Sequence, residues 1–178
     1  MILTRCAVLL RGINVGRHNQ LPMADLRSLL TDLGAYEVVT HLRSGQAVVS
    51  VPVVEVERLA GRVEAALRER AGLRVAVLTR TAAELADLVA NNPYPHLAAT
   101  PDRLHAVFLA AQPDPARVAA IGTKHGGDEF IVGDRALYVA YAAGSYAAPV
   151  GKALAKLGGV QTARNWRTTL KLAELAAS

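Results

Sequence analysis

The sequence predicts an α+β protein built from two ferredoxin-like (alpha-beta plait) units, each with an antiparallel sheet and each followed by an extra helix. Apolar residues in the first half alternate between strand and helix spacing in the order βαββαβ. That order favours a four-stranded antiparallel sheet with two helices on one face, because right-handed crossovers remove most competing topologies. The same order returns after a stretch that contains three prolines, residues 92–103. We interpret the repeat as an internal duplication of architecture, without similarity of residues.

The first unit is expected to begin with an apolar strand at Thr4–Leu10. A helix follows from about Met23, where apolar side chains recur at helical spacing until Gly34. Two β-rich runs are separated only by Arg43-Ser44-Gly45, which is short enough for a hairpin turn. The remaining expected elements are strands at Glu37–Leu42, Gln46–Val51 and Leu73–Leu78, and a helix from Val56 that is closed by Gly72.

The core of the first unit follows from these periodicities, because alternate strand residues point to the face that the helices cover. The residues expected to be buried are Cys6, Val8, Leu10, Leu26, Leu29, Leu33, Leu59 and Val63. The single cysteine, Cys6, excludes an internal disulfide, and its place in a strand favours a buried structural thiol over redox chemistry.

A capping-box pattern from Thr81 to Glu84 begins a third helix, which ends before Asn91. The prolines that follow are typical of a boundary. We therefore expect an N-terminal unit at residues 1–91, a connection at 92–103 and a C-terminal unit at 104–178. The elements expected in the C-terminal unit are strands at Leu104–Ala111, Glu129–Val132, Leu137–Tyr141 and Val160–Ala163, and helices at Pro115–Ile121, Val150–Leu157 and Arg167–Ala176.

Composition favours a soluble, cytoplasmic protein with no membrane partner. The 178-residue chain is 52% hydrophobic, yet no apolar run approaches the roughly 20 residues of a membrane span, and the first residues lack a signal-peptide layout. The formal charge is +5. Much of it lies on one helix face where arginines alternate with glutamates, so charge alone does not indicate nucleic-acid binding.

The segment from Arg11 to Asn19, the opening loop, concentrates polar residues between a strand and a helix. Its glycines can turn the chain tightly and expose N–H groups, while Arg11 offers a planar cation for phosphate or carboxylate. In a ferredoxin-like unit this loop should be a neighbour of the Arg43–Gly45 turn. The alternative is a structural loop in which Arg11 pairs with a carboxylate and Asn14 caps the turn. Neither a P-loop nor a dinucleotide motif is matched, so we expect no cofactor.

A second polar cluster, Arg164 to Thr169, contains the only tryptophan. It can offer a stacking surface with two cations for a base or sugar phosphate. Its structural alternative has Asn165 or Thr168 as a helix N-cap, with Trp166 filling the seam between the halves. The histidines show no metal-ligand spacing, and no pair of carboxylates lies in the glycine-rich loops, so we expect no metal site.

Four short motifs carry a family resemblance: LLRGINVG at Leu9–Gly16, LRSG at Leu42–Gly45, NPY at Asn92–Tyr94 and ARNWRT at Ala163–Thr168. With them the chain resembles, over nearly its whole length, the bacterial family catalogued as domain of unknown function 1697. The resemblance implies a two-part α+β fold with ferredoxin-like units, and it implies no activity. The chain departs from the usual pattern at two positions, since the family typically has Asn where Gln46 stands and Gly where Arg17 stands.

These observations favour a module that binds a small anionic ligand, a nucleotide or phosphorylated metabolite, at the edge formed by the opening loop and the first hairpin. The candidate ligand-binding residues are Arg11, Gly12, Asn14, Gly16, Asn19, Arg43 and Ser44, with Arg164 and Arg167 as contributors from the second half. A nucleic-acid-binding protein is the first alternative. It is disfavoured because an RRM-like sheet needs aromatic residues on its first and third strands, and Thr4–Leu10 and Gln46–Val51 contain none. An enzyme of unrecognised type is the other alternative.

Overall fold

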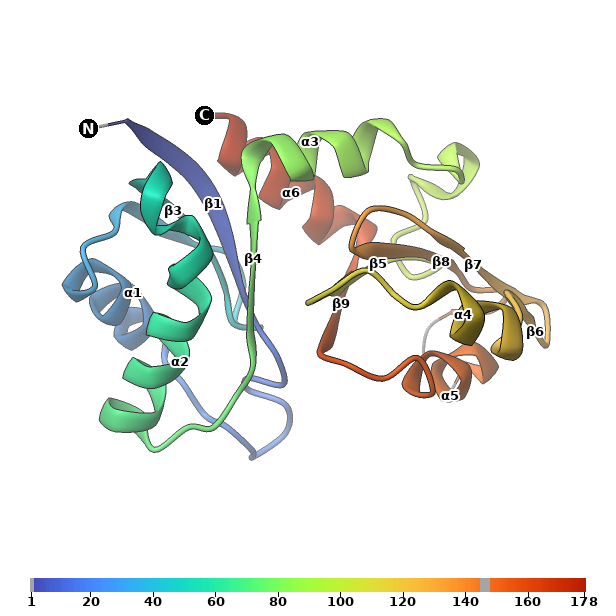
Figure 1. The fold of residues 1–178 in the computed structure, drawn as a ribbon, viewed down its shortest axis with the longest axis horizontal. Helices are drawn as coiled ribbons and strands as arrows, with labels where there is room; N and C mark the ends of the chain where they lie inside the picture. Colours follow the sequence, from blue (N-terminus) through green and yellow to red (C-terminus); the bar gives the residue numbers. More distant parts are fainter. Residues whose placement is uncertain (1, 145–147) are drawn as a thin grey trace. The chain divides into compact units, whose positions relative to one another are not determined.

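The computed structural model describes residues 2–144 and 148–178. Over these residues the chain is mixed α+β, with two antiparallel sheets and six α-helices (Figure 1). It divides into two compact units. Unit 1 comprises Met1–Ala86 together with Leu172–Ser178, and unit 2 comprises Asp87–Lys171.

Unit 1 has a four-stranded sheet with the strand order β2-β3-β1-β4. Its elements are β1 (Leu3–Leu10), α1 (Met23–Asp32), β2 (Tyr36–Thr40), β3 (Gln46–Pro52), a 3-10 turn η1 (Val53–Glu55), α2 (Val56–Ala71) and β4 (Val77–Thr81). The helices α1 and α2 lie on the same face of this sheet (Figure 1). The expected stop of α2 is confirmed: Gly72 has a φ of +65° and donates its N–H to the carbonyl of Leu67.

The expected core of unit 1 is confirmed with one exception. The buried members are Cys6, Val8, Leu10, Leu26, Leu29, Leu59 and Val63. Leu33 is only partly buried against this cluster, because α1 ends at Asp32 and Leu33 already belongs to the turn that Gly34 completes.

The fourth strand of unit 1 lies further along the chain than the expected Leu73–Leu78. Pairing with β1 begins at Leu10 opposite Val77 and continues to Cys6 opposite Thr81. Leu73 and Val75 instead pack beside the core in the connection from α2. The polar residues after Leu78 did not indicate a strand, yet they supply the backbone partners that β1 requires.

Unit 2 has a five-stranded sheet with the strand order β6-β7-β8-β5-β9. Its elements are a 3-10 turn η2 (Pro95–Leu97), β5 (Leu104–Leu109), α4 (Pro115–Ile121), β6 (Lys124–His125), β7 (Asp128–Val132), β8 (Ala136–Ala140), α5 (Pro149–Ala155) and β9 (Gln161–Asn165). Residues of α4 and α5 share one hydrophobic cluster with β5, β7 and β8. The short strand β6, which is not among the elements expected from the sequence, pairs with the start of β7.

One further helix follows directly after the last strand of each sheet, α3 after β4 and α6 after β9. Helix α3 (Ala82–Ala90) begins with the expected capping box, in which Thr81 N donates to Glu84 Oε2 (2.8 Å) and Glu84 N donates to Thr81 Oγ1 (3.3 Å). Helix α6 (Trp166–Ala177) is capped by Asn165, whose Oδ1 accepts from Thr168 N (2.9 Å). The last turn of α6 belongs to unit 1, where Arg5 Nη2 donates to the carbonyl of Leu175 (2.9 Å).

Candidate functional site

The opening loop of unit 1 is held together by the side chain of Asn14. Its Oδ1 accepts from Leu21 N (2.8 Å), and its Nδ2 donates to the carbonyl of Leu21 (2.9 Å) and to that of Arg43 (2.7 Å). Asn14 has a φ of +55°, a backbone conformation that Asn tolerates better than most residues. This one amide therefore joins the two ends of the loop to each other and ties the loop to the first hairpin.

Other amides complete the loop. Asn14 N donates to the carbonyl of Asn19 (3.1 Å), and Asn19 Nδ2 donates to the carbonyl of Gly12 (3.1 Å). Gln20 Nε2 donates to the carbonyl of Gly16 (2.9 Å). The loop thus satisfies much of its own backbone, and its shape does not depend on a ligand.

The hairpin turn packs against the loop at Gly45. A Cβ at this position would lie 2.8 Å from Ile13 Cβ, and Gly45 has a φ of +74°. The carbonyl of Gly45 accepts from Leu10 N at the end of β1 (2.7 Å). The expectation that the opening loop and the Arg43–Gly45 turn are neighbours is confirmed.

Cationic side chains project from these two joined segments. Arg11, Arg17, His18 and Arg43 are all exposed. Within residues 2–144 and 148–178, no hydrogen bond or ion pair engages the guanidinium groups of the three arginines. The structural alternative expected a carboxylate partner for Arg11, and the described part of the chain contains none. It also expected Asn14 to hold the turn, and Asn14 does so.

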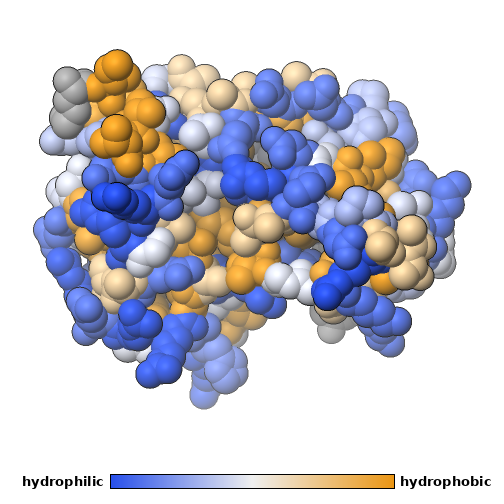
Figure 2. Space-filling view, in the orientation of Figure 1, coloured by the Kyte–Doolittle hydropathy of each residue, from blue (hydrophilic) through white to orange (hydrophobic). Residues whose placement is uncertain are grey.

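The hydrophilic character of this end of unit 1 contrasts with the opposite end of β1. Figure 2 shows an apolar patch at the upper left, where Figure 1 marks the N-terminus. Ile2, Val53 and Val54 are exposed apolar residues of unit 1. Val53 N donates to the carbonyl of Ile2 (3.1 Å), so these residues adjoin the start of β1. The opening loop follows the other end of the same strand.

One edge of unit 2 shows a similar pattern of backbone hydrogen bonds at the end of a strand, followed by a shorter connection. Leu10 N and Arg11 N donate to the carbonyls of Gly45 and Ala76, at 2.7 and 2.9 Å. In unit 2, Leu109 N and Ala110 N donate in the same way to Arg135 and Val160, both at 2.9 Å. Residues 110–114 are enough to connect β5 to α4, whereas residues 11–22 connect β1 to α1. The connection from β1 to α1, which contains the opening loop, is therefore the longer of the two.

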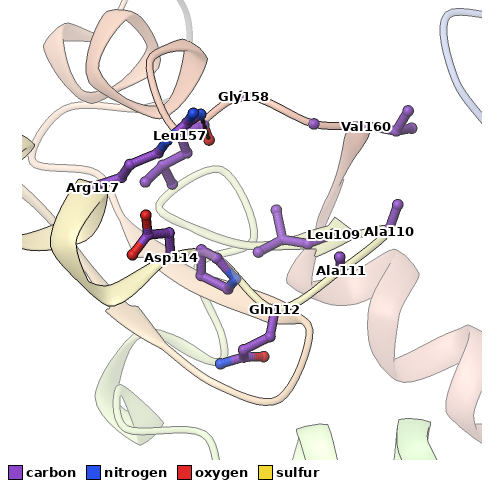
Figure 3. Close-up of a pocket in the computed structure, with 11 residues that line it drawn as sticks. Leu109, Ala110, Ala111, Gln112, Asp114, Arg117, Leu157, Gly158 and Val160 are labelled. Carbon is purple, nitrogen blue, oxygen red and sulfur yellow. Dashed lines mark hydrogen bonds between the residues drawn. The ribbon is translucent and has the colours of Figure 1, made fainter.

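That edge of unit 2 instead holds a pocket of about 270 Å³ that the sequence did not indicate (Figure 3). Arg117 and Asp114 lie on its α4 side, while Leu109 and Ala110 come from the end of β5. Arg117 Nη1 donates to the carbonyl of Leu157 (3.3 Å), and Asp114 Oδ1 accepts from Ala116 N (2.9 Å) as the N-cap of α4. These polar groups already serve the structure of the unit.

The second polar cluster, Arg164 to Thr169, which we call the closing cluster, is largely buried. Arg164 is 9% exposed, and its Nη1 donates to Thr162 Oγ1 (2.7 Å) and to the carbonyl of Ala163 (2.8 Å). Burial lowers the pKa of Arg164 to about 10. Trp166 is 1% exposed and lies 6.2 Å from the ring of Tyr138. Arg167 alone keeps an exposed cation in this cluster.

Unit 1 also contains a buried arginine, Arg80, which sequence reasoning missed. Arg80 is 3% exposed, lies opposite Ala7, and donates through Nη1 to the carbonyl of Thr79 (2.7 Å). Arg164 lies opposite Ala106 in the same way. Burial also raises the pKa of the Cys6 thiol to about 12, although Arg80 acts in the opposite direction. Cys6 is thus an inert core residue.

Among the residues described, no three His, Cys, Asp or Glu side chains gather in a way that could hold a metal ion. No helix in the described ranges has both the length and the apolar character required to cross a bilayer.

The fold and the loop define an α+β protein with two antiparallel sheets and a cationic loop at one edge of the first. The family model described as "Protein of unknown function (DUF1697)" matches residues 3–138, and the chain belongs to this family. The match ends before the closing cluster. A solved structure, that of the conserved bacterial protein SP0830 from Streptococcus pneumoniae, has a TM-score of 0.78 and 22% identity, covering 98% of this chain and 99% of the other. That likeness concerns the fold alone. A comparison with curated proteins finds no match.

Proposed function

We propose that this protein binds a small anionic ligand, a nucleotide or phosphorylated metabolite, at the edge of unit 1 formed by the opening loop and the first hairpin turn. One observation carries the proposal. Arg11, Arg17 and Arg43 are exposed cations without a protein partner among the described residues, on two segments that the Asn14 amide joins. Unpaired guanidinium groups on adjoining segments suit a phosphate, which accepts charge-assisted and bidentate hydrogen bonds.

The loop residues divide into two roles under this proposal. Asn14 and Asn19 shape the loop through their amides, and Gly12 and Gly16 supply its left-handed turns, with φ of +67° and +58°. Arg11, Arg43 and the exposed Ser44 are the groups that contact the ligand. A loop already closed by its own hydrogen bonds loses little conformational entropy on binding, so more of the interaction energy remains as affinity.

The first test is a thermal-shift screen of nucleotides and sugar phosphates at low salt, because a ligand that binds only the folded state raises the melting temperature. We expect at least one phosphorylated compound to raise it, and the unphosphorylated nucleoside or sugar to leave it unchanged. Stabilisation by the unphosphorylated compound alone, or by no compound at concentrations of about 10 mM, would contradict an anion site.

We also propose that the two units repeat one ferredoxin-like architecture. The order β2-β3-β1-β4 in unit 1 corresponds to β7-β8-β5-β9 within the sheet of unit 2. The register supports the equivalence, since Ala7 pairs with Val48 and Arg80, as Ala106 pairs with Tyr138 and Arg164. In an experimental structure, β1, β3 and β4 should superpose on β5, β8 and β9 with this residue correspondence; a shifted register would contradict duplication.

A further inference from the structure

We propose that unit 2 carries a second site, a small pocket that binds a zwitterionic α-amino acid between Arg103, Glu129 and the hydroxyl of Tyr94. The pocket has a volume of about 120 Å³. Its lining side chains come from the segment around η2, the residue before β5, and strands β7 and β8 with the residues that follow. All of them belong to unit 2.

Tyr94 supplies the first observation. Its side chain is 5% exposed, and its hydroxyl is buried with no hydrogen-bond partner among the described residues. Buried tyrosine hydroxyls normally find a partner, so an orphan that lines a pocket indicates a missing one. The backbone position is fixed, because Tyr94 N donates to Asn92 Oδ1 (2.9 Å) and the carbonyl of Tyr94 accepts from Leu97 N (3.0 Å). The Asn92-Pro93-Tyr94 motif thereby holds the phenol in place.

The protonation state of Tyr94 makes it a lasting hydrogen-bonding group. Burial raises the pKa of Tyr94 to about 12, and the negative charge of Glu129 acts in the same direction. The hydroxyl is therefore protonated at neutral pH, and it can both donate and accept a hydrogen bond. Glu129 raises this pKa both by its charge and by a weak hydrogen-bonding interaction with the phenol, so its carboxylate lies close to the hydroxyl. The contact falls outside strict hydrogen-bond geometry and leaves room for a better partner.

Arg103 supplies the cation of the pocket. Its Nε donates to the carbonyl of Tyr141 (3.0 Å), and Tyr141 N donates back to the carbonyl of Arg103 (2.9 Å). This double link fixes the base of the guanidinium, while its two terminal nitrogens have no partner in the described part of the chain. Two parallel N–H groups of this kind match the two oxygens of a carboxylate.

Glu129 supplies the opposite charge. It lies on β7 opposite Ala140, and its carboxylate is close enough to the Tyr94 hydroxyl to raise the pKa of that group. It makes no ion pair with any residue of the described ranges. The pocket thus offers a cation and an anion that are not paired in a salt bridge, together with a neutral phenol beside the anion. A ligand whose carboxylate faces Arg103 and whose ammonium faces Glu129 and Tyr94 satisfies all three groups at once.

The volume restricts the size of this ligand. A cavity of about 150 Å³ can hold benzene, which has about six heavy atoms. A pocket of about 120 Å³ therefore suits glycine, L-alanine or L-serine. The two sites we propose accordingly differ in both ligand charge and ligand size.

The test is saturation-transfer NMR and calorimetric titration of the full chain with glycine, L-alanine and L-serine. We expect at least one of them to bind, and propionate and ethylamine, which each carry one of the two charges, to bind at least about tenfold more weakly. Glu129→Gln and Tyr94→Phe should each weaken binding about tenfold or more. Glu69→Gln and Tyr36→Phe, at exposed positions of unit 1, are the matched controls and should change nothing.

Melting curves separate this proposal from a simple packing defect. Tyr94→Phe removes only an unpaired hydroxyl, so it should keep or raise the melting temperature while it weakens binding. Two results would overturn the proposal: no binding of the three amino acids at about 10 mM, or unchanged affinity in both pocket variants. Equal binding of propionate would also overturn it, because the site would then recognise only a carboxylate.

Discussion

Replacement of Asn14 by alanine tests most sharply whether the opening loop is a preformed structure. The side chain makes three hydrogen bonds, two to Leu21 and one to the carbonyl of Arg43, at 2.7–2.9 Å. Alanine removes all three and must also adopt a φ near +55°. The variant therefore removes the side-chain hydrogen bond that ties the loop to the hairpin, without changing any charge.

The magnitude can be worked out from these contacts. Net contributions of roughly 0.5–1.5 kcal/mol per hydrogen bond and roughly 1–2 kcal/mol for a Cβ residue in left-handed backbone give about 3 kcal/mol, once the partial exposure of Asn14 is allowed for. For a chain of this length that corresponds to a fall in melting temperature of about 6–12 °C. Asn14→Gly should recover the backbone part, about 1 kcal/mol.

Urea unfolding followed by circular dichroism measures this loss. Asn91→Ala is the matched control, because its Nδ2 makes a single exposed hydrogen bond to the carbonyl of Asp87 (2.8 Å) and should cost less than about 1 kcal/mol. If Asn14→Ala lost no more stability than this control, the loop would not be held by the Asn14 amide, and the preformed ligand edge would be without support.

Three further outcomes are expected. Tyr138→Phe should cost about 1 kcal/mol in urea unfolding, because its hydroxyl donates to a backbone carbonyl of α3 (2.8 Å). Cys6, with its pKa raised to about 12, should react with a thiol reagent at pH 8 far more slowly in the native protein than in urea; equal rates would contradict its burial. Gly45→Ala should lower the free energy of unfolding by at least about 2 kcal/mol more than Gly12→Ala. Both glycines have a positive φ, but only Gly45 lacks room for a Cβ, because Ile13 lies beside it. Equal melting temperatures of the two variants would refute the close packing.

Local signals in the sequence predicted the elements well. The capping box at Thr81 and the stop at Gly72 depend on residues within one turn, and both have the expected geometry. The contact between the opening loop and the Arg43–Gly45 turn followed from topology, since adjacent strand ends bring these segments to one edge.

Features that depend on tertiary contacts could not be read from the sequence. The fourth strand of unit 1 was predicted too early in the chain, at Leu73–Leu78, whereas it lies at Val77–Thr81. Polar residues such as Arg80 do not indicate a buried strand, because only the surrounding tertiary structure buries them. Arg164 has its guanidinium engaged by neighbours on its own strand, which a charged motif does not reveal. The pocket near Tyr94 was missed because Arg103 and Glu129 come from separate segments of the chain.

The central claim is that Arg11 and Arg43 bind one anionic group. Calorimetric titration of the best phosphorylated hit against Arg11→Ala and Arg43→Ala tests it directly, with the exposed Arg68→Ala on α2 as the control of equal charge. Loss of a charge-assisted hydrogen bond, roughly 1.5–3 kcal/mol, predicts binding weaker by about ten- to a hundredfold in each variant, with unchanged melting curves and a near-normal control. Equal affinity in all three variants, or the same loss in Arg68→Ala, would contradict a site at this edge.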